Sequence, residues 1–246
     1  MHRFFVDTGA ISGDRVELRD QVASQVTKVL RLRAGENIIV LDDTGFEYLV
    51  ELDSVNPKRV IGLITNRIQE QNDATINVTL CQSVLKGDRL DYVFQKCTEL
   101  GVVNFVPTLC SRALYRGPGW SSNRMSRWRT VVKEASEQSE RSRLPSISGA
   151  VDFETACDMV QGVGIILWER EKAVTLKTSL ICPDIFTDRR LTIFVGPEGG
   201  FTDQEVDYAK TAGIASVSLG KRILRAETAA ISAVSIVMHE LGELDP

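Results

Sequence analysis

A glycine-rich segment, Phe194–Val206, has the composition of a ligand-binding loop that leaves a strand and enters a helix. Three glycines within five positions let the backbone adopt positive φ angles and approach a ligand without an intervening Cβ. Thr202 and Glu205 form the pattern of a capping box, so we expect a helix to begin there. The spacing matches neither a dinucleotide-binding motif nor a phosphate loop, which argues against nucleotide phosphates as the ligand. A tight turn without any ligand explains these residues equally well.

A second segment, Ser218–Ala233, carries cations into an alanine-rich helix. Gly220 ends an apolar run and is followed by Lys221, Arg222 and Arg225. An arginine at the start of a buried helix either forms a structural salt bridge or is directed into a site. The residues alone leave both possibilities open.

Both segments need a sheet to hold them, and the sequence predicts one over residues 73–246. Apolar runs alternate there with helical patterns, which is typical of an α/β fold with mainly parallel strands. Ligands of such sheets bind beyond the carboxyl ends of the strands, where both segments begin. The expected strands cover residues 76–84, 102–110, 164–169, 191–196 and 215–220; helices are expected over 88–100 and 122–140, and after each of the last two strands.

The first 72 residues are expected to form a separate, small β-barrel with one helix. Four β-branched and aromatic runs separated by turn residues indicate its strands, at residues 2–6, 37–43, 46–55 and 59–65. Between them, Asp20–Leu32 has apolar residues at helical spacing behind an aspartate that can cap the first turn. The polar segment Ile68–Thr75 marks the boundary, which gives domains 1–72 and 73–246.

The composition, with 43% hydrophobic and 25% charged residues, is that of an ordinary soluble globular protein. No apolar run is long enough to span a membrane and the N-terminus lacks a signal-peptide pattern, so we expect no membrane association. The five cysteines form no CxxC pair and only two histidines accompany them, so we expect no metal site. An odd number of cysteines without a pairing pattern suits a reducing, cytoplasmic compartment.

The net charge of −4 is unevenly distributed along the chain: it is −2 over residues 1–72, +4 over 73–144 and −6 over 145–246. A localised basic region on an acidic protein indicates a polyanionic partner. A solvated helix surface is the simpler explanation on composition alone.

Several segments together resemble the RsmE family, methyltransferases of the SPOUT superfamily. VGPEGGFT and LGKRILRAETA, at residues 195–202 and 219–229, are similar to the paired signature of this family. Residues 86–112 and 133–147 resemble two further family segments, and HRFF with KVLRLRAGE resembles its PUA-like RNA-binding domain. The resemblance implies an N-terminal PUA-like β-barrel over residues 1–72, followed over 73–246 by a SPOUT α/β domain with a C-terminal trefoil knot.

The same resemblance implies transfer of a methyl group from S-adenosyl-L-methionine to N3 of one uridine in the 16S rRNA of the small ribosomal subunit. It also implies a cytoplasmic homodimer formed through the knot region. Three strand-end loops would hold the cofactor: Leu167, Trp168 and Glu169; Val195, Gly196, Pro197, Glu198, Gly199 and Gly200; and Leu219, Gly220, Arg222, Ile223 and Leu224, with Thr228 and Ala229 behind them.

The chemistry of N3 methylation suggests two catalytic residues. The N3 proton of uracil must leave, so the reaction needs a base, or a cation that stabilises charge developing on the flanking oxygens. Arg225 is our candidate for the cation, because a guanidinium is always charged and its fork can address a uracil oxygen. Glu198, and more weakly Glu227, is our candidate for the base, although a glutamate that accepts from backbone amides is an equally good interpretation. No cysteine is needed, since N3 attack requires no covalent thiolate intermediate.

Arginines of the basic region and of the first domain are the candidate phosphate contacts. They are Arg3, Arg31, Arg33, Arg112, Arg116, Arg124, Arg127, Arg129, Arg141 and Arg143. Trp120 and Trp128 have the chemistry to stack on bases, but Trp128 lies beside valines on a helix and we expect it to pack. His239 is expected in the core or in an interface.

Two alternatives stay open at this point. The chain is either another SPOUT RNA methyltransferase, acting on a ribose 2′-hydroxyl or on tRNA, or an RNA-binding ribosome assembly factor without catalytic activity.

Overall fold

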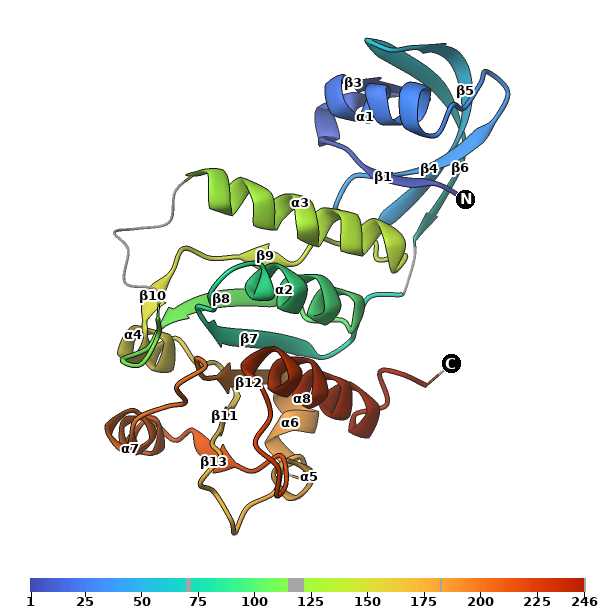
Figure 1. Ribbon diagram of the computed structural model, residues 1–246. Coiled ribbons are helices and arrows are strands. Elements are labelled where there is room, and N and C mark those ends of the chain that lie inside the picture. The colour runs from blue at the N-terminus through green and yellow to red at the C-terminus, as the bar shows by residue number, and fades with distance from the viewer. Residues whose placement is uncertain (70–71, 115–121, 182, 246) are drawn as a thin grey trace. The chain divides into compact units, whose positions relative to one another are not determined.

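The computed structural model describes residues 1–69, 72–114, 122–181 and 183–245 (Figure 1). The chain divides into two compact units: Met1–Asp73 with Ser136–Leu144, termed unit 1, and Ala74–Ala135 with Pro145–Pro246, termed unit 2. The boundary expected from the sequence fell after residue 72, and the membership of residues 136–144 in the first unit was not predicted.

Unit 1 is built on a six-stranded sheet with the order β1-β4-β5-β6-β3-β2, in which only the β1–β4 pair is parallel. Its core contains Phe4, Val16 and Val40 from the sheet and Ala23 from the helix. The expected N-terminal β-domain is therefore confirmed, with an additional hairpin. The elements are β1 (Arg3–Phe5), the short helix Thr8–Ala10, β2 (Ile11–Ser12), β3 (Arg15–Arg19), α1 (Asp20–Ser24), β4 (Asn37–Leu41), β5 (Phe46–Asn56) and β6 (Arg59–Gln69).

The helix of unit 1 is shorter than expected. The α-helical part ends at Ser24, and a π-helical turn continues over Gln25–Val29. Asp20 does not cap this helix: it is the first helical residue and has a positive φ of 50°, while Arg19 takes the N-cap position without a side-chain hydrogen bond.

Residues 136–144 are joined to unit 1 by hydrogen bonds and an ion pair. The Phe5 amide donates to Glu137 Oε1 at 2.9 Å, and the Leu144 amide donates to an oxygen of Asp43 at 2.6 Å. Arg141 pairs with Asp73 at 3.2 Å. A segment from the middle of the sequence therefore completes the first unit.

Unit 2 contains a parallel sheet with the strand order β10-β8-β7-β12-β11-β13, and β9 pairs with β8. The alternation seen in the sequence is confirmed. Five short elements were not predicted from the sequence: the strands β9 and β10, and the helices α4 (Phe153–Asp158), α5 (Leu176–Ser179) and α6 (Pro183–Asp188). The strands are β7 (Asn77–Ser83), β8 (Asn104–Leu109), β9 (Ser146–Ile147), β10 (Val151–Asp152), β11 (Val163–Leu167), β12 (Arg190–Val195) and β13 (Ala215–Val217).

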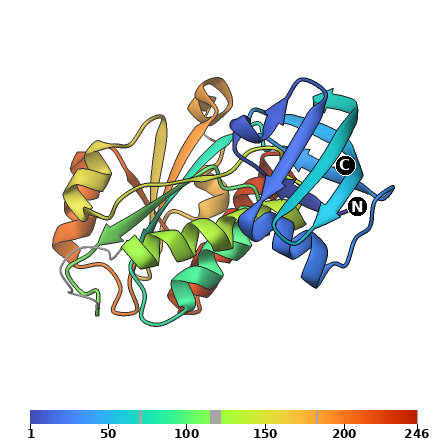
Figure 2. The same cartoon turned by 90° about the horizontal axis from the view of Figure 1, so that it is seen from above.

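Helices cover both faces of this sheet. One core contains side chains from α2 (Arg89–Glu99), α3 (Ser122–Gln138), α5 (Leu176–Ser179), α6 (Pro183–Asp188) and α8 (Ala226–Glu240). The other core contains side chains from α4 (Phe153–Asp158) and α7 (Asp203–Thr211), which lie together at one side of the sheet (Figure 2). Among the described residues, no helix is long and apolar enough to cross a membrane.

The arrangement of the strands places the predicted binding loops together. β7, β12, β11 and β13 are neighbours in this order and run parallel, so the loops that follow them emerge at one edge of the sheet. The loop after β13 is fixed from two sides, because the Leu176 amide donates to Ser218 O at 3.1 Å and the Ser218 amide donates to Val174 O at 2.9 Å. The trefoil knot implied by the family resemblance stays a prediction.

Candidate active site

A cavity of about 540 Å³ lies at the carboxyl edge of the sheet in unit 2, where the loops after β11, β12 and β13 converge. Of the predicted cofactor-binding residues, all except Thr228 line it, and so does Arg225. Four further residues that the sequence analysis did not assign to the site also line it: Arg89, Phe201, Ser218 and Ala226.

The glycine loop after β12 is closely packed where its glycines lie. A Cβ on Gly196 would come within 3.1 Å of the Phe201 ring, and one on Gly199 within 3.1 Å of Arg112 Cβ. Gly200 has a φ of 68°, and a Cβ there would contact the Glu169 carboxylate at 3.1 Å. These glycines are needed for close approach within the loop, as well as for any approach to a ligand.

The capping box predicted at the start of α7 is confirmed. The Glu205 amide donates to Thr202 Oγ1 at 3.1 Å, and the Thr202 amide donates to Glu205 Oε2 at 2.8 Å. Glu205 Oε1 also accepts from the Ser111 amide at 2.8 Å, and the Glu205 side chain is buried. One carboxylate therefore fixes both the end of the glycine loop and the chain after β8.

The loop after β11 is organised by Glu171. Its Oε1 accepts from the amides of Lys172 and Ala173 at 2.9 Å each, and its Oε2 accepts from the Ser216 hydroxyl at 2.5 Å. The Ser216 hydrogen bond, followed by the Ala173 amide, lowers the pKa of Glu171 to about 2. The loop that carries Trp168 and Glu169 into the cavity is thus held by a carboxylate that stays ionised over the physiological range.

The loop after β13 leads to Arg225 and α8. Gly220 has a φ of 109° and its Cβ position is open, so the backbone there is exposed toward a ligand. Arg225 takes the N-cap position of α8 without a side-chain capping bond, and its side chain is exposed. Its carbonyl accepts from the Ala229 amide at 2.8 Å, which fixes the backbone of the residue. The guanidinium therefore remains available to the cavity.

Glu198 joins the glycine loop to the segment between β7 and α2. Its Oε1 accepts from the Lys86 amide and from Arg89 Nη1, both at 3.2 Å. Its Oε2 is buried and has no hydrogen-bond partner among the described residues. The alternative in which Glu198 accepts from backbone amides is thus partly realised, although the amide belongs to another loop. Glu227 Oε2 is also buried and without a partner in the described part of the chain, but Glu227 does not line the cavity.

The predicted phosphate contacts fall into different environments. Arg3 and Arg141 are buried in unit 1, with 8% and 5% of their side chains exposed, and they pair with Glu47 and Asp73. A phosphate could reach either one only if its ion pair opened, so the structure favours a structural role for both. Their burial could not be recognised from residue type. Arg116 and Trp120 lie outside the described residues.

Arg112 has a structural contact in the site: its Nη1 donates to Gly199 O at 3.2 Å and to Phe201 O at 3.1 Å, which fixes the glycine loop. Arg31 and Arg33 are exposed in unit 1. Arg143, also exposed, donates to Thr44 O at 2.8 Å.

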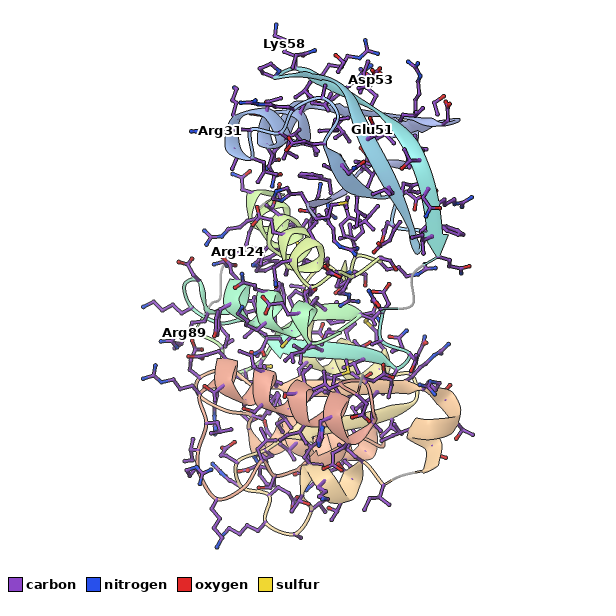
Figure 3. The ribbon with its side chains drawn as sticks, turned by 90° about the vertical axis from the view of Figure 1, so that its right-hand side faces the viewer. Arg31, Glu51, Asp53, Lys58, Arg89 and Arg124 are labelled. Atoms are coloured by element: carbon purple, nitrogen blue, oxygen red, sulfur yellow. The ribbon has the colours of Figure 1, made fainter. Side chains whose placement is uncertain are left out.

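On α3, Arg124 lies with its guanidinium 5.8 Å from the Trp128 ring centre (Figure 3). Arg127 pairs with Asp88 at 3.0 Å and with Asp91 at 2.5 Å. Trp128 is 1% exposed and donates to Asp91 at 2.8 Å, so the expectation that it packs is confirmed.

The described cysteines, Cys81, Cys97, Cys110 and Cys157, are buried and free. Burial raises the pKa of Cys110 and Cys157 to about 12, which makes both thiols poor nucleophiles. No group of three or more potential metal ligands occurs within the described ranges. His239, expected in the core or in an interface, is exposed on α8.

Comparisons with known proteins agree with this architecture. The chain matches the RNA methyltransferase domain family over residues 72–238 and the RNA methyltransferase PUA domain family over residues 26–65. The ribosomal RNA small subunit methyltransferase E of Synechocystis is 34% identical over 82% of this chain and 65% of its own length. The protein of the same name from Bacillus subtilis is 29% identical over 98% of this chain and 97% of its own length.

A solved structure of ribosomal RNA small subunit methyltransferase E from Neisseria gonorrhoeae, bound to S-adenosyl methionine, covers 98% of both chains with a TM-score of 0.86 and 32% identity. The same kind of enzyme, an RNA methyltransferase, is indicated by the family match over most of the chain, by the two relatives and by the solved structure. The chain therefore belongs to the RsmE family of RNA methyltransferases, in which a PUA domain precedes an α/β domain of the SPOUT type.

Proposed function

We propose that this chain methylates N3 of one uridine in the 16S rRNA of the small ribosomal subunit, with S-adenosyl-L-methionine as methyl donor. The observation that carries the proposal is the cavity at the carboxyl edge of the unit 2 sheet, lined by the three loops that the family resemblance assigns to the cofactor. The relatives named for methylation of small-subunit rRNA, and the S-adenosyl methionine bound to the Neisseria protein, support it.

The residues of the cavity fit this cofactor. Leu167, Val195 and Leu224 supply apolar surface for an adenine ring. The open backbone at Gly220 allows main-chain groups to contact the ligand directly. The carboxylate of Glu169, which also lines the cavity, can accept from ribose hydroxyls. When bound, S-adenosylmethionine supplies an electrophilic methyl group on a positively charged sulfur.

Arg225 and Glu198 are the proposed catalytic residues. Arg225 stabilises the negative charge that develops on a uracil oxygen as N3 loses its proton. Glu198 accepts this proton: its Oε1 is occupied by two donors, so Oε2, without a partner in the described part of the chain, is the oxygen that receives it. N3 would then form its bond to the methyl carbon as the bond from that carbon to sulfur breaks, and the proton held by Glu198 would be released to solvent after the products leave.

RNA is proposed to contact the exposed arginines Arg31, Arg33 and Arg127, together with Arg124, which is half-buried on α3. We also propose that the protein is a homodimer and acts in the cytoplasm, where small subunits are assembled. The exposed side chain of Ile223, 85% accessible in the loop that lines the cavity, supports an apolar contact with a second copy. Light scattering of the purified protein tests the dimer.

Two measurements test the proposed reaction. Calorimetry with S-adenosylmethionine and S-adenosylhomocysteine should give micromolar affinity for at least one of them. Nucleoside mass spectrometry of small subunits from cells lacking the enzyme, after incubation with protein and cofactor, should then yield 3-methyluridine. A 2′-O-methylated product or methylated tRNA would replace the proposed reaction with that of another SPOUT enzyme. A folded protein that binds neither ligand, with or without RNA, would support the assembly-factor alternative.

A further inference from the structure

A fourth loop, between β7 and α2, contributes a cation to the cavity. Arg89, the first residue of α2, lines the cavity together with the glycine loop and is labelled in Figure 3. The family resemblance assigns three loops to the site, and this segment is not among them. The sequence could not indicate the contact, because Arg89 and its partner Glu198 are 109 residues apart.

The guanidinium of Arg89 is bound to Glu198 through one nitrogen, and nearly half of the side chain is exposed to solvent. Nη1 donates to Glu198 Oε1 at 3.2 Å, while 45% of the Arg89 side chain is exposed. A guanidinium has five N–H donors, and the one contact that Arg89 makes among the described residues, to a single carboxylate oxygen, leaves most of these donors unused there. Glu198 is itself anchored by the Lys86 amide, so the guanidinium is positioned by a fixed partner.

The same segment connects the cavity rim to the candidate RNA-binding surface of unit 2. Asp88, which precedes Arg89, pairs with Arg127 on α3, and Asp91 accepts from both Arg127 and Trp128. Arg124 lies one helical turn before Trp128 on α3. Arg89 therefore lies between two residues, Asp88 and Asp91, that contact α3, and it also lines the cavity that the target base would have to enter.

We propose that Arg89 binds a backbone phosphate of the RNA at the target nucleotide and so positions the base for methylation. The partly filled, planar fork suits an anionic oxygen pair such as that of a phosphodiester. This inference rests on the proposed function, because it takes RNA as the substrate of the cavity. It adds a contact that neither the three cofactor loops nor Arg225 provides.

The test compares Arg89→Gln, which removes the charge, with Arg89→Lys, which keeps it. Equilibrium binding to unmethylated small subunits is measured across a series of salt concentrations, and S-adenosylhomocysteine affinity is measured by calorimetry. Arg190→Ala is the matched control, since Arg190 is an exposed arginine at the opposite end of β12 whose side chain donates to Gln161. Circular dichroism verifies that each variant is folded.

Loss of one phosphate contact predicts weaker RNA binding by Arg89→Gln and a salt slope smaller in magnitude by about 0.7–0.9. Arg89→Lys should keep most of the slope, the control should equal wild type, and S-adenosylhomocysteine affinity should change less than threefold in every variant. An unchanged slope in Arg89→Gln would overturn the proposal. A tenfold loss of S-adenosylhomocysteine affinity with an unchanged slope would also overturn it and assign Arg89 to the cofactor. If wild type binds subunits but yields no 3-methyluridine, the proposed reaction fails, while the slope comparison still decides the role of Arg89.

Discussion

Arg225→Ala provides the sharpest test of the proposed catalysis, because the structure separates the function of this residue from its structural contribution. The side chain of Arg225 makes no capping bond to α8, and the helix keeps the hydrogen bond from the Ala229 amide to the Arg225 carbonyl after truncation. We therefore expect the free energy of unfolding to change by no more than about 0.5 kcal/mol, as for other surface substitutions.

The expected effect on catalysis is much larger. Removing one group that stabilises developing charge typically lowers kcat by about 10²–10³-fold, or about 2.7–4 kcal/mol of transition-state stabilisation. The affinity for S-adenosylhomocysteine should fall less than tenfold, which corresponds to less than about 1.4 kcal/mol. Arg225→Lys keeps the charge but loses the planar fork, so its activity should lie between those of wild type and the alanine variant.

The assay follows transfer of an isotope-labelled methyl group to unmethylated small subunits at saturating cofactor, with nucleoside analysis of the product. Lys221→Ala is the matched control, because this cation belongs to the same loop but does not line the cavity. Turnover by Arg225→Ala within threefold of wild type would refute the assigned role. An equal loss of kcat and of S-adenosylhomocysteine affinity would instead identify Arg225 as a cofactor-binding residue.

Three further predictions concern the loops and the RNA-binding surface. Glu205→Ala leaves the amides of Ser111 and Thr202 without their acceptor. Urea unfolding should therefore show a free energy of unfolding lower by about 2–4 kcal/mol, and cofactor binding should weaken. A free energy of unfolding equal to that of wild type would contradict the bridging role of this carboxylate. Because the pKa of Glu171 is lowered in the folded protein, its ionised form stabilises the folded state above pH 4.5. The free energy of unfolding of wild type should therefore exceed that of Glu171→Gln by less and less as the pH falls from 4.5 toward 2. A difference that does not change with pH would argue against the Ser216 contact. Arg124→Glu should reduce the magnitude of the salt slope of RNA binding by at least about 0.7 and leave cofactor affinity unchanged, and an unaltered slope would exclude this arginine from the RNA contact.

Sequence patterns predicted a structural feature correctly where that feature depends on residues within a single helix, strand or turn. The Thr202–Glu205 capping box depends on two side chains three residues apart and on the backbone between them, so its pattern was sufficient to predict it. The strands β7, β11 and β12 were recognisable because buried parallel strands form continuous apolar runs. The expectation that the ligand site lies beyond the carboxyl ends of these strands agrees with the cavity, which the loops after β11, β12 and β13 line.

The remaining features depend on contacts between distant segments, which no local pattern encodes. Arg3 and Arg141 have the residue type of a phosphate contact, yet each is buried against a carboxylate far away in the sequence. Asp20 has the residue type of an N-cap, but the strand β3 extends to Arg19, so the cap falls one residue earlier. Arg89 was missed for the same reason: only the pairing of β7 with β12 brings it to Glu198.

The return of residues 136–144 to unit 1 has a consequence for how the protein is made. The chain up to Asp73 leaves the ribosome without Glu137 and Arg141, so Asp73 and the Phe5 amide still lack their partners. At translation rates of about 5–20 residues per second, the missing segment follows after roughly 4–14 s. The N-terminal unit must therefore wait, incompletely folded, until more than half of the chain has been synthesised. For the same reason, a fragment that ends at residue 72 should be less stable than the same unit in the full-length protein.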